Sequence, residues 1–391
     1  MIALEEARAC MIAHARTLET ERVDLGNALY RILAEDVHAD RDMPPFNKSA
    51  MDGYACRRAD LAQVLSVIET VKAGQMPRHA VGPGECAKIM TGAPIPDGAD
   101  CVVMVEHSEC PSEGTVRVRT TASHGNICLR GEDMKAGEVV LRQGGRIAPQ
   151  HIAVLASVGC VRPLVSRRVR VGVIATGDEL TAPEAQPGPS QIRNSNSHQL
   201  CGQAASMGAI PRYYGIVLDT EAAIGEALRA GLGENDVVLI SGGVSMGDFD
   251  FVPDAMRKNQ VEILFDRIAV KPGKPTTFGV APHGYCVGLP GNPVSTFVQF
   301  ELLVKPFLYK LMGHDIRVPF LPFRLAREVA RKKTGREAWI PVCITPDSEV
   351  EAVDYHGSAH AHALCGADGL LKIPAGVSRL EKGAWVRVRP I

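Results

Sequence analysis

Three short apolar runs rich in β-branched residues constrain the fold of this chain more than any other feature of its sequence. They span residues 169–175, 236–240 and 285–289, and each run ends in a glycine-containing segment that carries hydroxyl or carboxylate groups. Such runs are typical of buried parallel strands, which are apolar on both faces because helices cover both sides of the sheet. We therefore expect a central α/β domain with a mostly parallel sheet whose carboxyl edge binds a ligand.

The segments that follow these runs are suited to binding oxyanions. Glycine turns and helix starts leave free N–H groups that point toward an anion. Each segment alone is a weak signal, but three on one edge form a stronger one, and a proline-stiffened turn adds two lysines. None of them is a dinucleotide-binding or Walker loop, because neither consensus follows a strand here. The segments are Thr176-Gly-Asp-Glu-Leu180, Ser241-Gly-Gly-Val-Ser-Met-Gly-Asp248 and Pro290-Gly-Asn-Pro-Val-Ser295, and the turn is Lys271-Pro-Gly-Lys274.

Five acidic residues stand beside a glycine or at a strand end, where the backbone can approach a ligand. For Glu179 and Asp219 the alternative is that they only cap helices. If several of the acids converge, each pair at about 4 Å repels by roughly 4 kcal/mol at an effective dielectric near 20. Such a cluster requires a cation, and oxygen ligands without a Cys or His pattern favour Mg²⁺. The five are Asp52, Asp133, Glu179, Asp219 and Asp250.

Length and composition set the remaining bounds. At 391 residues the chain is expected to contain two to four domains, since a domain has about 100–200 residues. No apolar run approaches the ~20 residues that span a bilayer, and no secretion signal is recognisable, so we expect a cytoplasmic protein. A net charge of −1 gives no indication of nucleic-acid binding. The eleven cysteines include no Cys-x-x-Cys pair and are interpreted as reduced core residues.

Periodicity predicts the other elements around this centre. Residues 53–142 carry short strands punctuated by glycine and proline, which favours a small all-β unit. Period-two alternation beyond residue 318 predicts a carboxy-terminal β-barrel or sandwich. Proline at 306 is expected to kink the last long helix. The predicted helices are 4–16, 149–157, 194–207, 221–230, 251–258 and 294–312, and the predicted late strands are 339–344, 370–373 and 384–389.

Two further motifs favour ordinary structural interpretations. His356, His360 and His362 suggest a transition-metal site, but their spacing matches no standard zinc pattern and no nearby cysteine completes it. We therefore interpret them as loop residues flanking Ser358. The basic run Arg331-Lys-Lys333 is interpreted as a solvated turn rather than a nucleic-acid contact.

Seven motifs occur together in an order that resembles a known family, the molybdopterin molybdenumtransferases, or molybdenum insertases, whose eukaryotic relative is the carboxy-terminal part of gephyrin. The resemblance runs from about residue 4 to the end. The motifs are Pro44-Pro-Phe-Asn-Lys-Ser-Ala-Met-Asp-Gly-Tyr54, Met90-Thr-Gly-Ala-Pro94, Gly131-Glu-Asp133, Thr176-Gly-Asp-Glu-Leu180, Ser241-Gly-Gly-Val-Ser245, Lys271-Pro-Gly-Lys-Pro275 and Leu289-Pro-Gly-Asn-Pro-Val-Ser295.

The resemblance implies an elongated, four-part subunit that forms a homodimer with a cleft shared between subunits. Its parts would be an amino-terminal connecting domain at 1–52 and 143–167, an inserted β-rich domain at 53–142, an α/β molybdopterin-binding domain at 168–315 and a carboxy-terminal β-barrel at 316–391. The implied substrates are adenylylated molybdopterin and molybdate, with Mg²⁺ as cofactor and AMP as a product. Transient contact with the molybdopterin adenylyltransferase and with molybdoenzyme maturation proteins is also implied, whereas nucleic acid and membranes are not expected partners.

The resemblance also assigns roles to individual residues of this chain. Glu179, Asp219 and Asp250 are expected to hold the metal. The implied catalytic group is Asp52, Thr91, Asp133, Glu179, Asp219 and Asp250. The implied substrate-binding group is Ser241, Gly242, Gly243, Ser245, Lys271, Lys274, Pro290, Asn292, Pro293, Ser295, Arg336 and Ser358.

The sequence departs from the family pattern at two places beside these residues. Asn47-Lys48 stands where Asp-Asn is usual, and Asp368 stands where an asparagine is usual, which leaves the preference between molybdate and tungstate open. Two alternatives remain at this point. One is an amidase-type enzyme acting on a nicotinamide nucleotide, which would share the α/β module but not the motif at 49–53 or the lysine turn. The other is a non-catalytic scaffold, which would need long partner-binding appendages.

Overall fold

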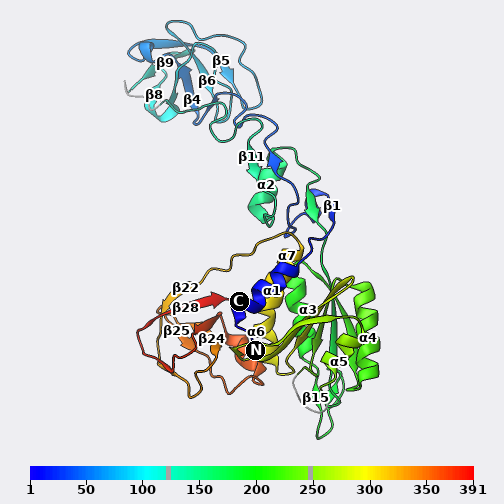
Figure 1. The fold of residues 1–391 in the computed structure, drawn as a ribbon. Helices are drawn as coiled ribbons and strands as arrows, with labels where there is room; N and C mark the ends of the chain where they lie inside the picture. The colour runs from blue at the N-terminus through cyan, green and yellow to red at the C-terminus, as the bar shows by residue number, and fades with distance from the viewer. Residues whose placement is uncertain (120–124, 245–249) are drawn as a thin grey trace.

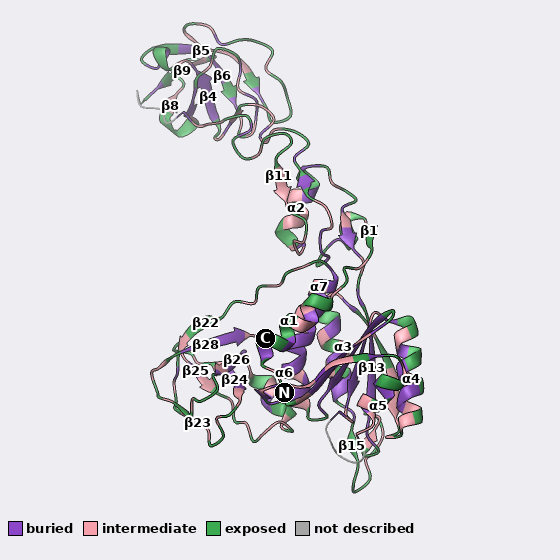
Figure 2. Cartoon of the chain, in the orientation of Figure 1, coloured by how far each residue is buried: buried purple, intermediate pink, exposed green. Residues whose placement is uncertain are grey.

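The computed structural model describes residues 1–119, 125–244 and 250–391 of an elongated molecule. Figure 1 shows three parts along its length. A distal lobe, residues 53–118, lies at one end and a narrow stalk, residues 20–49 and 127–166, connects it to a larger body. The body contains the α/β sheet and the carboxy-terminal strands, and the first helix packs within it rather than in the stalk. The buried residues are concentrated in the body and in the centre of the distal lobe (Figure 2).

The sheet of the body is mostly parallel, as the apolar runs predict. β13 pairs in parallel with β16 and β17, and β17 pairs in parallel with β21, whereas β20 and β18 extend the sheet antiparallel. The chain places β16 on one side of β13 and the later strands on the other, so the strand order reverses between β13 and β17. Ligands bind at such reversals. The order is β16 (Ile210–Val217), β13 (Arg170–Thr176), β17 (Val237–Ser241), β21 (Gly284–Leu289), β20 (Pro275–Ala281), β18 (Glu262–Arg267).

Helices cover both faces of this sheet because alternate side chains of each buried strand are apolar. Val173 and Leu239 belong to the core on one face, while Ile174 and Ile240 belong to the core on the other. The first face is covered by α1 (Leu4–His14), α3 (Asn196–Ser206), α6 (Pro293–Gln299) and α7 (Lys305–Leu311), and the second by α4 (Glu221–Glu234) and α5 (Val252–Lys258) (Figure 1).

The helix expected at 294–312 is interrupted before its proline. α6 continues into a π-helical segment, Phe300–Val304, in which the amide of Lys305 donates to the carbonyl of Phe300, and α7 follows. Pro306 has no amide to donate to the preceding turn and its ring crowds that turn. The interruption is therefore confirmed, but it takes the form of a widened turn ahead of Pro306.

The distal lobe is a six-stranded sheet, in agreement with the predicted all-β unit. Its strands pair antiparallel except β5 and β6, which are parallel. The order is β7 (Cys101–Met104), β4 (Gly53–Cys56), β6 (Glu85–Ile89), β5 (Val64–Val71), β9 (Thr115–Val118), β8 (Ser108–Glu109), with short helices at Arg58–Asp60 and Val105–His107.

The stalk is built from pairs of short strands that bring together two separate stretches of sequence. The sheet of the distal lobe ends at Val118, and the expected domain limit at residue 142 stays a prediction. The pairs are β3 (Lys48–Ser49) with β10 (Ile127–Cys128), β2 (Val37–His38) with β11 (Val139–Leu141), and β1 (Thr20–Arg22) with β12 (Leu164–Ser166). A short helix, Leu25–Asn27, and α2 (Pro149–Ser157) complete it.

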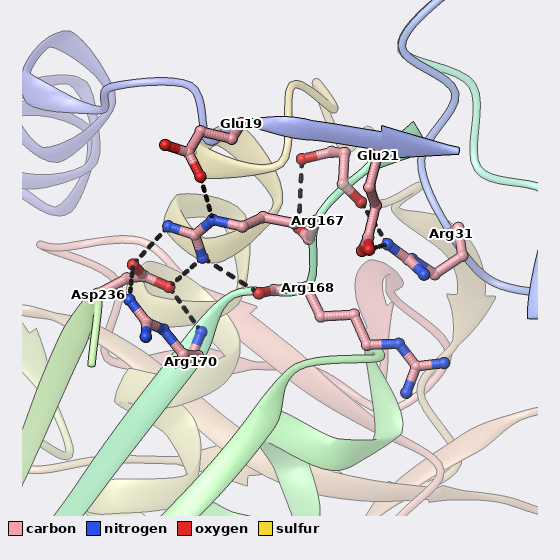
Figure 3. Close-up of polar contacts among 8 residues, drawn as sticks. Glu19, Glu21, Arg31, Arg167, Arg168, Arg170 and Asp236 are labelled. Atoms are coloured by element: carbon pink, nitrogen blue, oxygen red, sulfur yellow. Dashed lines mark hydrogen bonds and ion pairs between the residues drawn. The ribbon is translucent and has the colours of Figure 1, made fainter. Parts of the chain in front are cut away.

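An ionic network joins the stalk to the body (Figure 3). Arg167, which follows β12, donates from both terminal nitrogens to the two oxygens of Asp236 at 2.8 Å, and Asp236 also accepts from the amide of Arg170 at 2.8 Å. Burial opposes the charge on Asp236, but these partners outweigh it and lower the pKa of that carboxyl below its usual value. Glu19 contacts Arg167 from the stalk side at 3.6 Å. We call Arg167, Arg170 and Asp236 the joint.

The carboxy-terminal strands form a β-rich domain. Among the described strands no pairing joins β19 to β22, so closure into a barrel stays a prediction. The order is β19 (Val270–Lys271), β24 (Glu337–Ile344), β26 (Gly369–Ile373), β28 (Trp385–Pro390), β22 (Leu321–Arg324); β25 (Val350–Ala352) adds to β24, β23 (Val329–Ala330) pairs with β27 (Arg379–Leu380), and Ala361–Gly366 forms a short helix.

The cysteines and the helix lengths bear on two expectations from the sequence, that the thiols are reduced and that the chain does not span a membrane. All eleven cysteines are unpaired, but only Cys56, Cys86, Cys101 and Cys286 are buried, and the interpretation as core residues is wrong for Cys110 and Cys365, which are exposed. Within the described ranges, no helix has both the length and the apolar character needed to cross a membrane.

Candidate functional site

A cavity of about 710 Å³ lies at the carboxyl edge of the central sheet, between β13 and β17. We call it the rim cavity. Nine of the predicted site residues line it, which confirms that the glycine-containing segments meet at one edge. They are Glu179, Asp219, Ser241, Gly242, Gly243, Asp250, Pro290, Asn292 and Pro293. Ser245, which was predicted with them, lies outside the described residues.

Glycine is required where β17 ends in the rim cavity. Gly242 has a φ of +102° and Gly243 a φ of +60°, a backbone region that side chains with a Cβ rarely adopt. A Cβ on Gly242 would also collide with the carbonyl oxygen of Thr176 on the neighbouring strand, β13. The two strand ends can therefore lie close together and expose their backbone to a ligand only because this position has no side chain.

Asn196 is a residue of the rim cavity whose role the sequence did not reveal. Its Nδ2 donates to the Ser241 hydroxyl at 2.9 Å and to the Gly291 carbonyl at 2.7 Å, so it ties the ends of β17 and β21 together. Its Oδ1 is buried without a partner among the described residues. The segment at 194–197 signalled only a helix start, because the contact with Ser241 depends on tertiary packing.

The acidic residues of the rim cavity do not form a preformed metal cage. Asp219 accepts a hydrogen bond from the hydroxyl of Thr176, and the carboxylate of Glu179 folds over the backbone of Gly177. Across the described parts of the chain, no three His, Cys, Asp or Glu side chains converge as a metal site. Glu179, Asp219 and Asp250 nevertheless surround one cavity with hard oxygen donors, which fit Mg²⁺ when a substrate supplies further oxygens.

A second cavity of about 610 Å³ adjoins the first and has the opposite charge. We call it the lysine cavity. Lys271, Arg331 and Arg336 line it together with Ser295 and Ser358, and its described lining contains no acidic residue. The two cavities share three lining residues, Pro275, Pro290 and Asn292. Acidic and basic surfaces therefore meet across a single turn at the end of β21.

Backbone carbonyls hold the guanidinium groups of the lysine cavity in place. Arg336 donates to the carbonyl of Val270 at 2.9 Å, next to Lys271. Arg331 donates to the carbonyls of Val377, Arg336 and Pro374 at 2.6–2.7 Å, and burial lowers its pKa below the usual value. The interpretation of Arg331 as part of a solvated turn is therefore wrong. Its neighbours Lys332 and Lys333 are exposed, as expected.

The carboxy-terminal domain contributes to both cavities, with Ser358 in the lysine cavity and Ala359 and Ala361 in the rim cavity. Asn292 donates to the Ser358 hydroxyl at 3.0 Å, and the amide of Val294 donates to the Ser358 carbonyl at 3.0 Å. Asn292 and Ser358, two residues of the predicted substrate-binding group, are thus in contact within one chain. Lys274, by contrast, is exposed and lines neither cavity, although Lys271 of the same turn lines one.

The histidines beside Ser358 form a stack rather than a metal site. The rings of His356 and His360 lie 5.2 Å apart at an interplanar angle of 9°, and those of His360 and His362 lie 6.4 Å apart at 17°. His356 and His362 are exposed, and His360 is partly buried. His356 and His360 lie in a loop, as expected, whereas His362 lies in the short helix Ala361–Gly366.

Three of the predicted site residues lie far from the body. Asp52 accepts two hydrogen bonds from Thr91, one from its amide and one from its hydroxyl, both at 2.7 Å. The amide and then the hydroxyl lower the pKa of Asp52. We call this pair the distal loop site. Asp133 follows β10 in the stalk, with its amide bonded to the carbonyl of Met43 at 3.0 Å. None of the three lines the rim cavity or the lysine cavity.

Comparison with known proteins finds matches along almost the whole chain. Three family profiles match in order: MoeA N-terminal region (domain I and II) over residues 2–159, probable molybdopterin binding domain over residues 172–310, and MoeA C-terminal region (domain IV) over residues 323–391. A molybdopterin molybdenumtransferase of Staphylococcus epidermidis is 39% identical over 409 residues, covering 99% of this chain and 95% of that protein. The chain belongs to the molybdopterin molybdenumtransferase family.

Other members of the molybdopterin molybdenumtransferase family agree in length and fold. The Haemophilus influenzae enzyme is 38% identical over 400 residues, covering 100% of this chain and 98% of its own. The molybdopterin biosynthesis moeA protein from Pyrococcus horikoshii OT3 has the same fold, with a TM-score of 0.86 at 31% identity over 100% of both chains.

Membership in the molybdopterin molybdenumtransferase family confirms the predicted family, the enzyme class and the role in molybdenum cofactor biosynthesis. The amidase-type alternative is disfavoured, because the matched profiles also cover residues 2–159 and 323–391, which that alternative does not require. The roles of individual residues stay predictions.

Proposed function

We propose that this chain inserts molybdate into adenylylated molybdopterin with release of AMP, and that the rim and lysine cavities act together. The observation that carries the proposal is the division of charge between them. Glu179, Asp219 and Asp250 line one cavity, whereas Lys271 and Arg336 line the other, whose described lining is free of acids. Two anionic substrates can lie side by side only if each meets positive charge. The division supports molybdate in the lysine cavity and the substrate phosphates in the rim cavity.

On the rim side, the chain binds and orients the pterin substrate. Ser241, Gly242 and Gly243 line this cavity, and because the Gly242 amide donates to the Leu289 carbonyl at 3.1 Å, the Gly243 amide is the backbone donor that we assign to the phosphate oxygens. Glu179, Asp219 and Asp250 would hold Mg²⁺, which supplies positive charge to the phosphate oxygens when it is bound. Asn196 keeps the strand ends in register through its two hydrogen bonds.

On the other side, Lys271 and Arg336 attract and orient the oxyanion. Arg336 is fixed by the Val270 carbonyl, and the hydroxyls of Ser295 and Ser358 add donors to the same cavity. Since the reaction needs no covalent nucleophile from the protein, positioning and charge account for the chain's contribution.

The distal loop site enters this proposal through a second copy of the chain. Asp52 and Thr91 are carried by the distal lobe, remote from the rim cavity of their own chain (Figure 1). An elongated subunit in a symmetric homodimer can place its lobe against the body of its partner, because a two-fold interface makes each contact twice. We therefore propose that the cleft is completed by the distal loop of the other subunit.

Two substitutions test the division of charge. Asp219→Asn is expected to raise the Mg²⁺ concentration needed for half-maximal AMP release and to lower kcat by about 100-fold, since one cation ligand is lost. Lys271→Gln is expected to raise KM for molybdate by about tenfold with a smaller effect on the Mg²⁺ requirement. AMP release from adenylylated molybdopterin is measured while Mg²⁺ and molybdate are titrated separately.

Each substitution has a control of the same residue type. Asp254→Asn, an exposed acid on α5, should leave both titrations unchanged. Lys274→Gln should have a smaller effect than Lys271→Gln, because Lys274 lines neither cavity. The proposal fails if Asp219→Asn and Lys271→Gln shift the same titration, or if neither shifts any.

A further inference from the structure

A third cavity of about 470 Å³ lies apart from the rim cavity, between α1, the segment 314–320 and the carboxy-terminal sheet. We call it the α1 cavity. It shares no lining residue with the rim cavity, and with the lysine cavity it shares only Trp339 among the described residues. Its volume falls within the range of about 300–1,000 Å³ that is typical of small-molecule sites.

A buried guanidinium with incomplete bonding lines this cavity. Arg389 on β28 is 4% exposed, and its Nε has no partner among the described residues. Its side chain makes a single 3.4 Å contact with Glu301. That carboxylate already accepts from Lys305 at 2.9 Å and from Gln203 at 3.2 Å. A guanidinium carries five donors, and burying it without partners is costly, so Arg389 is suited to receive an anion.

Two more arginines line the same cavity without a fixed counter-charge. Arg8 on α1 and Arg317 in the connecting segment are exposed and form no ion pair within the described ranges. The two acids of the lining are already engaged: Glu5 pairs with Lys372 at 3.1 Å, and Asp315 pairs with Lys310 at 2.7 Å. Burial, and then the nearby charge of Arg8, lower the pKa of Arg389 against the opposing effect of Glu301.

Part of the cavity wall is apolar and aromatic. Trp339 is 2% exposed and lies against the ring of Phe320, with centroids 6.0 Å apart. Leu4, Ile12 and Leu302 extend this wall. The lining therefore combines an apolar surface with cationic donors, which suits a bound amphipathic molecule.

We propose that the α1 cavity binds an organic anion in which a carboxylate or phosphate monoester is joined to an aromatic or branched apolar group. The anionic end lies among Arg8, Arg317 and Arg389, and the apolar end packs against Trp339 and Phe320. This site is separate from the two cavities assigned to the transfer reaction. Its occupation can be measured without that reaction.

The tryptophans of the chain provide a direct reporter. The sequence contains two tryptophans, and the second, Trp385, is 66% exposed on β28. In a Trp385→Phe background the emission comes from Trp339 alone, which lines the α1 cavity and the lysine cavity, and substitutions at the α1 cavity distinguish the two. Phenyl phosphate is expected to change this emission saturably, whereas inorganic phosphate and benzyl alcohol, which each carry half of the required chemistry, should bind at least about tenfold more weakly.

Substitutions at the mouth of the cavity locate the binding. Arg8→Gln and Arg317→Gln should each weaken phenyl phosphate binding by about tenfold, because one charge-assisted contact is lost at a position whose exposure leaves folding intact. Arg229→Gln on the exposed face of α4 is the control and should bind as the parent does. The inference is overturned if phenyl phosphate gives no saturable change, if benzyl alcohol binds equally well, or if both arginine variants match the control.

Discussion

At the scale of single residues, Asp52 combines exposure with a fixed geometry. Its carboxylate accepts both the amide and the hydroxyl of Thr91 on an exposed loop of the distal lobe, and these contacts hold its pKa below the usual value. A carboxylate bonded in this way stays ionised and points in one direction. Because the site is exposed, these two hydrogen bonds contribute little to the stability of the fold. Their main effect is to hold the negatively charged carboxylate of Asp52 in one orientation.

Thr91→Val tests that geometry. The variant removes the hydroxyl donor but keeps the amide, so the pKa of Asp52 should rise part of the way toward the ordinary value of about 3.9. Since the native pKa is the lower one, the associated stability is present above the unfolded pKa and disappears as pH falls through the native pKa. Carboxyl ¹³C chemical shifts measured against pH give the result. Thr91→Ser, which keeps a hydroxyl, is the control, and equal Asp52 pKa values in all three proteins would contradict the assignment.

At the scale of elements, the ends of β13 and β17 show how one position can determine a cavity. The two strands are parallel neighbours, and the chain leaves β17 through Gly242 with a left-handed φ. The apolar runs and their glycines predicted this edge because each run is buried on both faces. Sequence alone did not identify Asn196 as a site residue, and it did not show that Lys271 lines a cavity whereas Lys274 does not. The contacts of Asn196 and the positions of the two lysines depend on how distant loops pack.

Gly242→Ala is expected to destabilise the protein by about 2–3 kcal/mol, because the added Cβ meets the Thr176 carbonyl and the residue must hold a positive φ. Urea unfolding measures the free energy. Gly233→Ala on the exposed side of α4 is the control, since its Cβ would meet no atom within 4 Å, and it should be neutral or stabilising by up to about 1 kcal/mol. Equal stabilities of the two variants would contradict the close approach of the strand ends.

At the scale of the whole molecule, the predicted site residues are divided between the distal part of the molecule and the body. The motif order identified the family and implied one shared cleft, and the body does bring the rim and lysine cavities together. Spacing could not locate Asp52 in space, because the stalk is made of two stretches, 20–49 and 127–166, whose pairing carries the intervening residues away. Arg331 was misjudged for a similar reason, since two of its three carbonyl partners, Val377 and Pro374, lie 46 and 43 residues further along the chain.

Co-expression of two inactive variants tests whether a second copy completes the cleft. Asp52→Ala and Asp219→Asn subunits, combined in equal amounts, should form mixed dimers with one intact cleft each, and AMP release should recover to about a quarter of the parent value. Each variant expressed alone is the control. If both residues acted within one chain, the mixed preparation would be as inactive as either variant.

Asp236→Asn tests the joint between stalk and body. Removing one negative charge leaves Arg167 without its bidentate partner in a half-buried setting, so the free energy of unfolding should fall by about 2–4 kcal/mol at neutral pH. The lowered pKa of Asp236 means that its stabilisation is present above the unfolded pKa and is lost as pH falls through the native pKa. The difference between parent and variant, followed by urea unfolding, should therefore shrink at acid pH. A constant difference would contradict the ionic basis of the joint.

The joint has a mechanical consequence for an arm of this length. A small rotation at the hydrogen-bonded pair of Arg167 and Asp236 would produce a much larger displacement of the distal loop site, because the stalk acts as a lever arm (Figures 1 and 3). Two parallel hydrogen bonds resist twisting as well as stretching, unlike a single point contact. The stiffness of this arginine–aspartate pair therefore contributes to how accurately Thr91 and Asp52 are positioned at the far end of the stalk.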